Sequence, residues 1–490
     1  MKRELVAAAI VLCACVPAAQ SQESHAKLIR LNVVALDAHG QPVTGLHRAD
    51  FQLLEDGKPQ DIAFFRFTGG WALRAKPGPG EYSNRDAARG HATVVLIDML
   101  SDRIMSDSVI SREVDGSLRN LESSEGLYLY ILTARGDLYP IHPLPKPDTE
   151  VTAAAEPWTR NIVPMLQAAL VKFVGIRPVD DRDIKYRYEM SINALRDLGS
   201  QMGQISGRKN LVWVTHGLPL AGYSVSMQTD VDFANPLRWF CEELEQAQIV
   251  VSTVAQSLDG ALAAVETYSA QSLDQVTSLT GGREYGSDSA GDAIRQASVD
   301  SRANYEIAYY PPPLKLDGKH HKIRIICGRK EVRLQTVQGF YALAPLISPA
   351  ILAPGGFSSR DLPREVEAAT HSPFEASDIG IRASVSRDPV YAQARRFEVH
   401  IDTADLLPRP TPDHDAGKVF VAFVAYDEGR KPLAHPILVS LTPEQFAGAT
   451  HGEIGFSEAI PVAPAIRKVR VIAFDAELGA LGSVTIPVRD

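Results

Sequence analysis

The sequence predicts an α/β doubly wound parallel sheet, inserted in or flanked by β-sandwich modules, followed by a C-terminal antiparallel β-sandwich. Three observations support this prediction. Between about residues 91 and 302, short continuous apolar runs alternate with stretches of helical period, which is typical of a parallel sheet covered by helices. Short β-like runs separated by turn residues flank this region at 27–70 and 303–342. The same β-like pattern fills residues 365–490.

The start of the chain is typical of a secretion signal. Two basic residues precede an apolar run from Leu5 to Val16, and small residues near Ala18 offer a cleavage position. The run is roughly 12 residues long, whereas a helix needs about 20 to cross a bilayer. We therefore assign residues 1–20 to a signal peptide. We expect an exported protein, in the periplasm, at the cell surface or outside the cell.

Cys15 provides an alternative at the same place. The run Leu12-Cys13-Ala14-Cys15 resembles the apolar-to-Cys box of bacterial lipoproteins, in which the final cysteine is acylated. A lipid anchor at Cys15 is therefore the alternative to ordinary cleavage near Ala18. Cys13 is atypical of that box, which favours ordinary cleavage. No later stretch is long and uncharged enough for a transmembrane segment.

The charge of the chain limits the class of partner that it can bind, and its cysteine content limits the disulfides that it can form. The formal net charge is -9, with acidic and basic residues interspersed, so we expect neither nucleic acid nor an anionic membrane as partner. Outside the signal region the cysteines are Cys241 and Cys327, which form either one disulfide or two thiols. We place them on a helix of the α/β region and on a β-strand, too far apart to bridge.

The first β module, residues 27–70, contains a hairpin signal. Glu55-Asp56-Gly57-Lys58 lies between two apolar runs, where a tight turn is expected. A Pro/Gly-rich break follows at 76–80. The module has too few strands to close a core alone, and residues 303–342 supply strands left over after the parallel sheet is complete. We therefore predict that the two segments pair.

In the α/β region, Ala92–Asp98 is a continuous apolar strand that ends in polar residues. Further strands are expected at 127–132, 137–144, 210–215, 249–254 and 283–285, and helices at 106–121, 162–174, 188–205, 236–247, 271–279 and 290–300. The functional crevice of such a sheet lies beyond the carboxyl ends of its strands, which places Asp98 and Thr215 at its rim. A Pro-rich linker, 343–364, separates this part from the C-terminal sandwich.

Several motifs in this order resemble the VWFA-related domain family of exported proteins, of acidobacterial type. They are the N-terminal run VVALDAHGQPVTGLHRADFQLLEDGKPQDIAFF, the strand ending in Asp98, and then SGRKNLVWVTHGLPL, LTGGREYG and DSRANYEIAYYPPP. The similarity covers about residues 27–342. The resemblance implies a von Willebrand factor A (vWA) domain in an exported protein, and it implies no established activity.

The resemblance also implies a metal site, because vWA domains commonly bind a divalent cation at the carboxyl edge of the sheet. The residues at the matching positions are Asp98, Asp102, Thr159 and His216. Leu100 stands where a hydroxyl ligand is usual, Asp102 replaces another hydroxyl, and His216 replaces an aspartate. Hard cations require oxygen ligands at short distances, so we expect a degenerate site without functional metal; the alternative is an altered site that holds a divalent cation.

Motifs of catalysis are missing from the sequence. It contains no GxSxG nucleophile elbow, no HExxH zinc motif and no phosphate-binding loop. His320 and His321 lie in an expected hairpin turn, where histidines are usually solvated. We therefore expect a non-enzymatic protein that mediates protein–protein interaction or adhesion at the cell envelope, with an unidentified protein partner. The alternative is an envelope hydrolase whose catalytic residues converge only in three dimensions.

Overall fold

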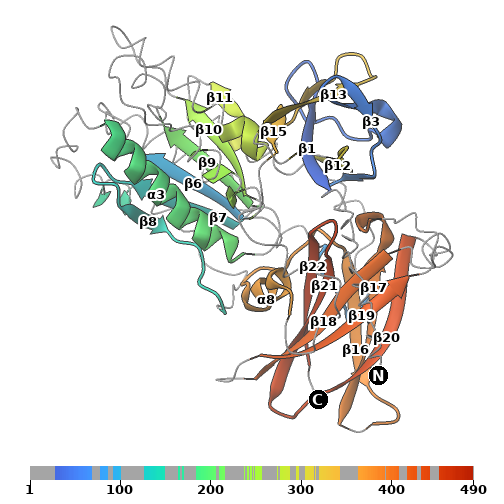
Figure 1. Ribbon diagram of the computed structural model, residues 1–490. Coiled ribbons are helices and arrows are strands. Elements are labelled where there is room, and N and C mark those ends of the chain that lie inside the picture. The colour runs from blue at the N-terminus through green and yellow to red at the C-terminus, as the bar shows by residue number, and fades with distance from the viewer. Residues whose placement is uncertain are drawn as a thin grey trace, which may run out of the picture.

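The structure is a computed structural model of the chain. It describes residues 28–68, 78–85, 92–100, 126–148, 184–205, 209–215, 249–255, 276–286, 304–313, 319–342, 362–391, 393–407, 417–427, 432–441 and 452–488, with isolated positions between them. These residues are mainly β-strand, arranged in five sheets, with few helices. Figure 1 shows them in three bodies: an α/β region, a first β module and a C-terminal β-sandwich.

The α/β region contains a six-stranded mixed sheet in the order β11-β10-β9-β6-β7-β8 (Figure 1). Its strands are β6 (Ala92–Asp98), β7 (Gly126–Leu132), β8 (Leu138–His142), β9 (Lys209–Thr215), β10 (Ile249–Ala255) and β11 (Glu284–Gly286). Neighbouring strands are parallel except at one edge, where β8 pairs antiparallel with β7. Along the chain, β7 and β8 follow β6 toward one edge of the sheet, and β9, β10 and β11 follow one another toward the other edge. The order therefore reverses between β6 and β9.

Alternate residues of β6 enter two different apolar clusters. Val94 and Leu96 pack in a cluster that also contains the buried side of α3 (Ile184–Gly203). Val95 and Ile97 pack in a second cluster. Every residue of the strand is buried. An uninterrupted apolar strand has this burial when both faces of its sheet are covered, which is what the sequence predicted for this run.

The expected helices of the α/β region can be followed only in part. The helix predicted at 188–205 is α3, which begins four residues earlier, at Ile184. The described positions within 162–174, 236–247, 271–279 and 290–300 are helical, except for a turn at 247. The helix predicted at 106–121 lies outside the described residues, as do the signal segment 1–20 and Cys15. Within the described parts of the chain, no helix combines the length and the apolar character needed to cross a bilayer.

The first β module takes strands from both sides of the α/β region. Its two sheets have the orders β14-β1-β12-β4 and β15-β13-β2-β3. The strands are β1 (Ile29–Leu36), β2 (Phe51–Glu55), β3 (Lys58–Gln60), β4 (Phe64–Phe67), β12 (Tyr305–Tyr309), β13 (His320–Cys327), β14 (Arg333–Gln335) and β15 (Gly339–Tyr341). β1 pairs with β12 and β2 pairs with β13, both antiparallel, so the early and late segments share both sheets and one apolar core.

The C-terminal region is an antiparallel sandwich of two four-stranded sheets, β20-β17-β16-β5 and β19-β18-β21-β22. Its strands are β16 (Ile381–Arg387), β17 (Ala394–Asp402), β18 (Gly417–Asp427), β19 (Leu433–Leu441), β20 (Glu453–Pro461), β21 (Ile466–Asp475) and β22 (Ala480–Pro487), together with β5 (Glu81–Ser83). The predicted bounds of this sandwich, 365–490, therefore omit β5. Three residues are too few to show the alternation of apolar and polar residues that is typical of a strand. α8 (Arg364–His371) begins where the linker 343–364 was expected to end.

Buried ion pairs connect the first β module to the C-terminal sandwich. Arg66 of β4 bonds to Glu306 of β12 and reaches across to the Asp378 carbonyl and the Asp405 carboxylate of the sandwich. Arg30 donates to Glu306 at 2.6 Å. Burial alone would lower the pKa of Arg66, but the carboxylates of Glu306, Asp405 and Asp378 raise it. Each charge in this contact is therefore compensated by another from a different segment of the chain.

The two cysteines of the described structure are not bridged. Cys241 is buried in the α/β region, and Cys327 ends β13 in the first β module. The prediction of two thiols agrees with this placement. Free-thiol labelling of a denatured, unreduced chain that begins at residue 21 is expected to find two thiols per molecule. Finding none would show a disulfide and contradict both the prediction and the placement.

Candidate functional site

The candidate site lies where β6 and β9 end side by side. The two strands are neighbours in the sheet and run parallel, so their carboxyl ends meet at one edge. β6 ends at Asp98 and β9 at Thr215. The strand order reverses between these two strands, since the next strand along the chain lies on one side for β6 (β7) and on the other side for β9 (β10). Such a reversal opens a crevice in α/β sheets, and ligands commonly bind there.

Asp98 is completely buried, and protein groups engage both of its carboxylate oxygens. Oδ1 accepts a hydrogen bond from the backbone N–H of Leu100 at 2.9 Å, and Oδ2 accepts one from the Thr215 hydroxyl at 2.8 Å. The first bond tightens the turn directly after β6, a common role for aspartate. The second bond ties the end of β6 to the end of β9. Asp98 thus fixes the geometry of this edge.

The described residues of this edge do not form a ligand set for a hard cation. Leu100, which occupies the position of a usual hydroxyl ligand, is only 1% exposed and packs in the apolar cluster beside α3. The oxygens of Asp98 already accept hydrogen bonds from Leu100 and Thr215. Mg²⁺ and Ca²⁺ need several oxygen ligands arranged around one point. The fit of such an ion to this part of the site is therefore poor.

Of the predicted site residues, only Asp98 lies in the described part of the chain. Asp102, Thr159 and His216 lie outside the described residues. The structure instead brings Asp98 together with Thr215, which the sequence placed at the rim of the crevice without giving it a role. Its position as the last residue of an apolar strand was the available signal, because a hydroxyl there faces the end of the neighbouring strand.

The comparisons with known proteins find weak structural likenesses. No family model and no curated protein matches the chain. Human COPII-coat protein Sec24c matches with 13% identity and a TM-score of 0.25, over 54% of this chain and 46% of that one. A von Willebrand factor type A protein from Catenulispora acidiphila matches with 8% identity and a TM-score of 0.30, over 58% of this chain and 74% of that one.

A β-glucosidase from Listeria innocua matches over 81% of this chain and 46% of that one, with 10% identity and a TM-score of 0.14. The chain thus covers less than half the length of both Sec24c and the glucosidase. All three TM-scores are too low to carry an argument about function.

Proposed function

We propose that the α/β region is a doubly wound domain of vWA type, and that the chain is a non-enzymatic, exported protein that binds another protein at the cell envelope. The observation that carries this proposal is the Asp98–Thr215 hydrogen bond at the reversal of strand order. It fixes the ends of two neighbouring strands at the place where α/β sheets bind their ligands. A rigid edge of this kind suits a recognition surface, because little order has to be gained on binding.

The strand order supports the doubly wound assignment. Counted along the chain from β6, the six strands lie in the order 3-2-1-4-5-6, which is a common order of doubly wound sheets. Apolar clusters on both faces of β6 agree with layers packed on either side. The antiparallel edge strand β8 is compatible with this class, because many doubly wound sheets carry one.

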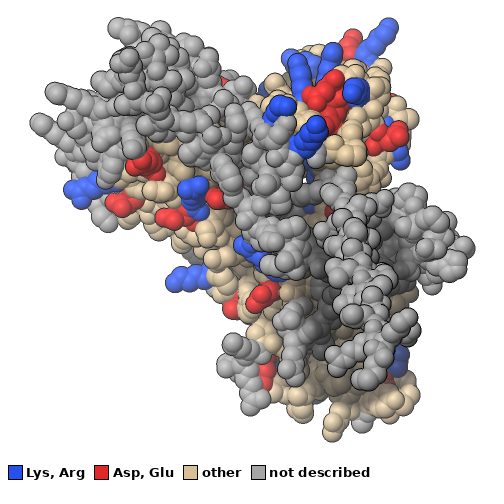
Figure 2. Space-filling model, in the orientation of Figure 1, with Lys and Arg blue, Asp and Glu red and all other residues tan. Residues whose placement is uncertain are grey.

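The surface supports a protein partner rather than nucleic acid. Figure 2 shows Lys and Arg side chains interspersed with Asp and Glu on the described parts of the visible face. A nucleic-acid partner would favour a continuous basic surface, because phosphate contacts supply most of its affinity. The net charge of -9 also disfavours an anionic partner. We accordingly propose an interaction or adhesion role, with secretion or surface attachment determined by the N-terminal segment.

We also propose that recognition at this edge does not depend on a hard cation. Leu100 is buried among apolar side chains, and Asp98 holds its two strands together by hydrogen bonds from the protein. The Asp98 carboxylate then has a structural role that needs no metal ion, so a chelator does not affect it. Binding of the partner should be unchanged by EDTA.

A capture experiment tests the proposed function. The mature chain, immobilised, is incubated with envelope extract with and without EDTA, and wild type is compared with Asp98→Ala. The variant leaves the Leu100 N–H and the Thr215 hydroxyl without their acceptor, which changes the edge. Capture of the partner is expected to fall about tenfold, corresponding to about 1.4 kcal/mol. EDTA should leave wild-type capture unchanged.

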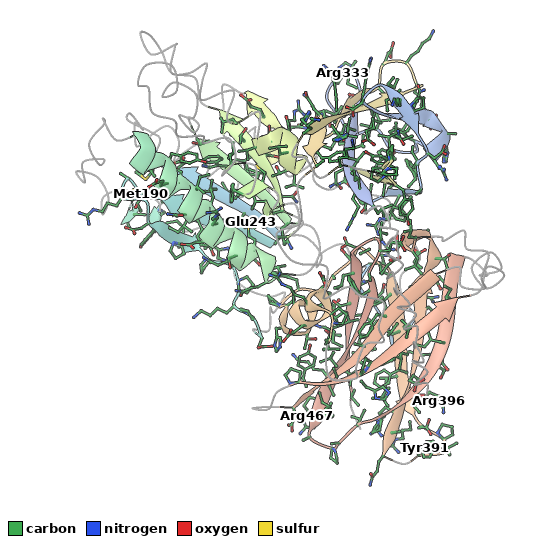
Figure 3. The ribbon with its side chains drawn as sticks, in the orientation of Figure 1. Met190, Glu243, Arg333, Tyr391, Arg396 and Arg467 are labelled. Carbon is green, nitrogen blue, oxygen red and sulfur yellow. The ribbon has the colours of Figure 1, made fainter. Side chains whose placement is uncertain are left out.

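Arg467→Ala is the matched control. Arg467 is exposed on β21, and Figure 3 places it on the C-terminal sandwich, away from the α/β region. It should capture the partner as wild type does. If Asp98→Ala captures as well as wild type, the contact surface is not this edge. If wild type retains no protein above the blank resin, the proposed interaction function is wrong.

A further inference from the structure

Glu55, Asp56 and His321 come together at one end of the first β module. Glu55 is the last residue of β2, and Asp56 begins the two-residue turn to β3. Asp56 and Gly57 both have positive φ, at 47° and 79°, as a tight type I′ hairpin requires. β13 pairs with β2 and brings His321 beside this turn. One ligand atom from each of the three side chains lies within 4.8 Å of the others.

The distances within this cluster are close to those between ligands of one metal ion. His321 Nδ1 lies 3.1 Å from Glu55 Oε1 and 3.0 Å from Asp56 Oδ2. Zinc bonds to nitrogen and oxygen are each about 2.0–2.2 Å, which puts the ligand atoms of a tetrahedral site about 3.3–3.6 Å apart, a few tenths of an ångström more than the two distances here. The three atoms therefore need little movement to coordinate a common ion.

Other protein groups hold each carboxylate by the oxygen that faces away from His321. The Tyr309 hydroxyl donates to Glu55 Oε2 at 3.0 Å, and the Lys322 backbone N–H donates to Asp56 Oδ1 at 2.8 Å. The oxygens left on the inner side, Oε1 and Oδ2, are the ones beside Nδ1. Outer hydrogen bonds of this kind orient metal ligands in known sites.

The imidazole of His321 is also held in place, and its inner nitrogen is unsatisfied. The ring stacks on Phe340, with centroids 5.1 Å apart and planes at 12°. Nδ1 is buried and makes no hydrogen bond, although the two carboxylate oxygens lie close to it. A buried nitrogen that lies near an acceptor without the geometry of a hydrogen bond stays unsatisfied, which costs free energy. A metal ion placed between the three atoms would remove that cost.

The cluster has an excess of negative charge. Glu55 is only 4% exposed and faces the core of the module, where an ionised carboxylate needs compensation. Across the described structure, the ion pairs of Glu55 and Asp56 are those with His321, and neither carboxylate pairs with lysine or arginine. Burial raises the pKa of Tyr309, and the Glu55 carboxylate raises it further, so Tyr309 remains a neutral donor. A bound cation would balance the two carboxylates.

We propose that Glu55, Asp56 and His321 bind one divalent transition-metal ion of the Zn²⁺ class. Imidazole beside carboxylates selects ions of this class over Mg²⁺ and Ca²⁺, which prefer oxygen ligands alone. Asp56 is 49% exposed at its side chain, so water reaches the ion and completes its coordination. The ion ties the β2–β3 turn to β13 and thereby joins the two halves of the first β module.

Zn²⁺ alone is the probe for this site. The metal-stripped mature chain is titrated by calorimetry with Zn²⁺, with Mg²⁺ as comparison. One equivalent of Zn²⁺ is expected to bind, with affinity at least tenfold weaker in His321→Gln and in Asp56→Asn. Asp56→Asn retains the acceptor for Lys322 and tolerates positive φ, so it should remain folded. Co²⁺ substitution should give visible absorption bands that His321→Gln lacks.

His320→Gln is the matched control, because His320 is the exposed neighbour of His321 on β13. Arg467→Ala is a second control, since Arg467 is exposed on β21 of the C-terminal sandwich. Both should bind Zn²⁺ as wild type does. Absence of stoichiometric Zn²⁺ binding by wild type overturns the proposal. So does a His321→Gln variant that binds with wild-type affinity and gives the wild-type Co²⁺ spectrum.

Discussion

Replacing Arg66 by methionine is expected to destabilise the chain by about 3–5 kcal/mol, the usual cost of removing one partner from a buried ion pair. The guanidinium group lies between the first β module and the C-terminal sandwich, and its side chain is 6% exposed. Methionine fills much of the volume but leaves Glu306 and Asp405 each with one fewer positive partner. Urea unfolding followed by tryptophan fluorescence and circular dichroism measures the loss.

Arg329→Met is the control for this prediction. Arg329 pairs with Asp50 at 3.0 Å in the same module, but its side chain is 44% exposed. Solvent screens an exposed ion pair, which therefore contributes little to stability, so this variant should unfold close to wild type. Equal destabilisation by the two variants would show that burial of Arg66 between the modules does not determine its contribution.

Lowering the pH from about 4.5 to about 2 is expected to remove on the order of 3 kcal/mol of stability through Glu306 alone. Burial would raise the pKa of Glu306, but Arg30 and Arg66 outweigh it and lower the pKa to about 2. The folded carboxyl thus holds its proton less tightly than the unfolded one, whose pKa is about 4.5. In this window the unfolded chain binds more protons, so stability falls as the pH falls.

Urea unfolding at several pH values between 5 and 2 measures this dependence. Glu306→Gln is less stable at neutral pH, because the variant loses a charge that pairs with Arg30 and Arg66. As the pH falls, the free energy of unfolding of the variant should decrease less steeply than that of wild type. The difference between the two slopes is the contribution of Glu306. Parallel pH profiles for the two proteins would contradict the assignment of the acid-sensitive step to Glu306.

Local pattern predicted the strands and much of their environment. Ala92–Asp98 was identified as a strand buried on both faces because seven consecutive residues suit burial and end in a polar one, and β6 has these bounds. The turn over Glu55-Asp56-Gly57-Lys58 was predicted because these residues lie between two apolar runs, and in the structure Asp56 and Gly57 have the positive φ of a tight hairpin turn. These features depend on neighbours in sequence, so the sequence contains what is needed to predict them.

Contacts between distant segments could not be predicted from the same patterns. β5 has three residues and shows no period, yet it pairs with β16. Asp56 accepts a hydrogen bond from Lys322 across 266 positions of sequence. The prediction that His320 and His321 lie in a hairpin turn was wrong, because both lie on β13, where His321 stands beside the acidic turn. At the candidate site, the sequence placed Asp98 and Thr215 at one edge through the rule for parallel strands. It did not indicate that they are hydrogen-bonded.

The shared sheets of the first β module determine the order in which the chain can fold. Arg30 and Glu306 are 276 residues apart, so β1 emerges during synthesis long before β12 exists to pair with it. Strands β6 to β11 need only partners within the α/β region, and that region can form first. Until the later segment arrives, the early strands present unpaired edges that invite aggregation. During translation the N-terminal strands therefore stay unpaired until the later segment has been made, and chaperones are expected to keep them from pairing with other chains.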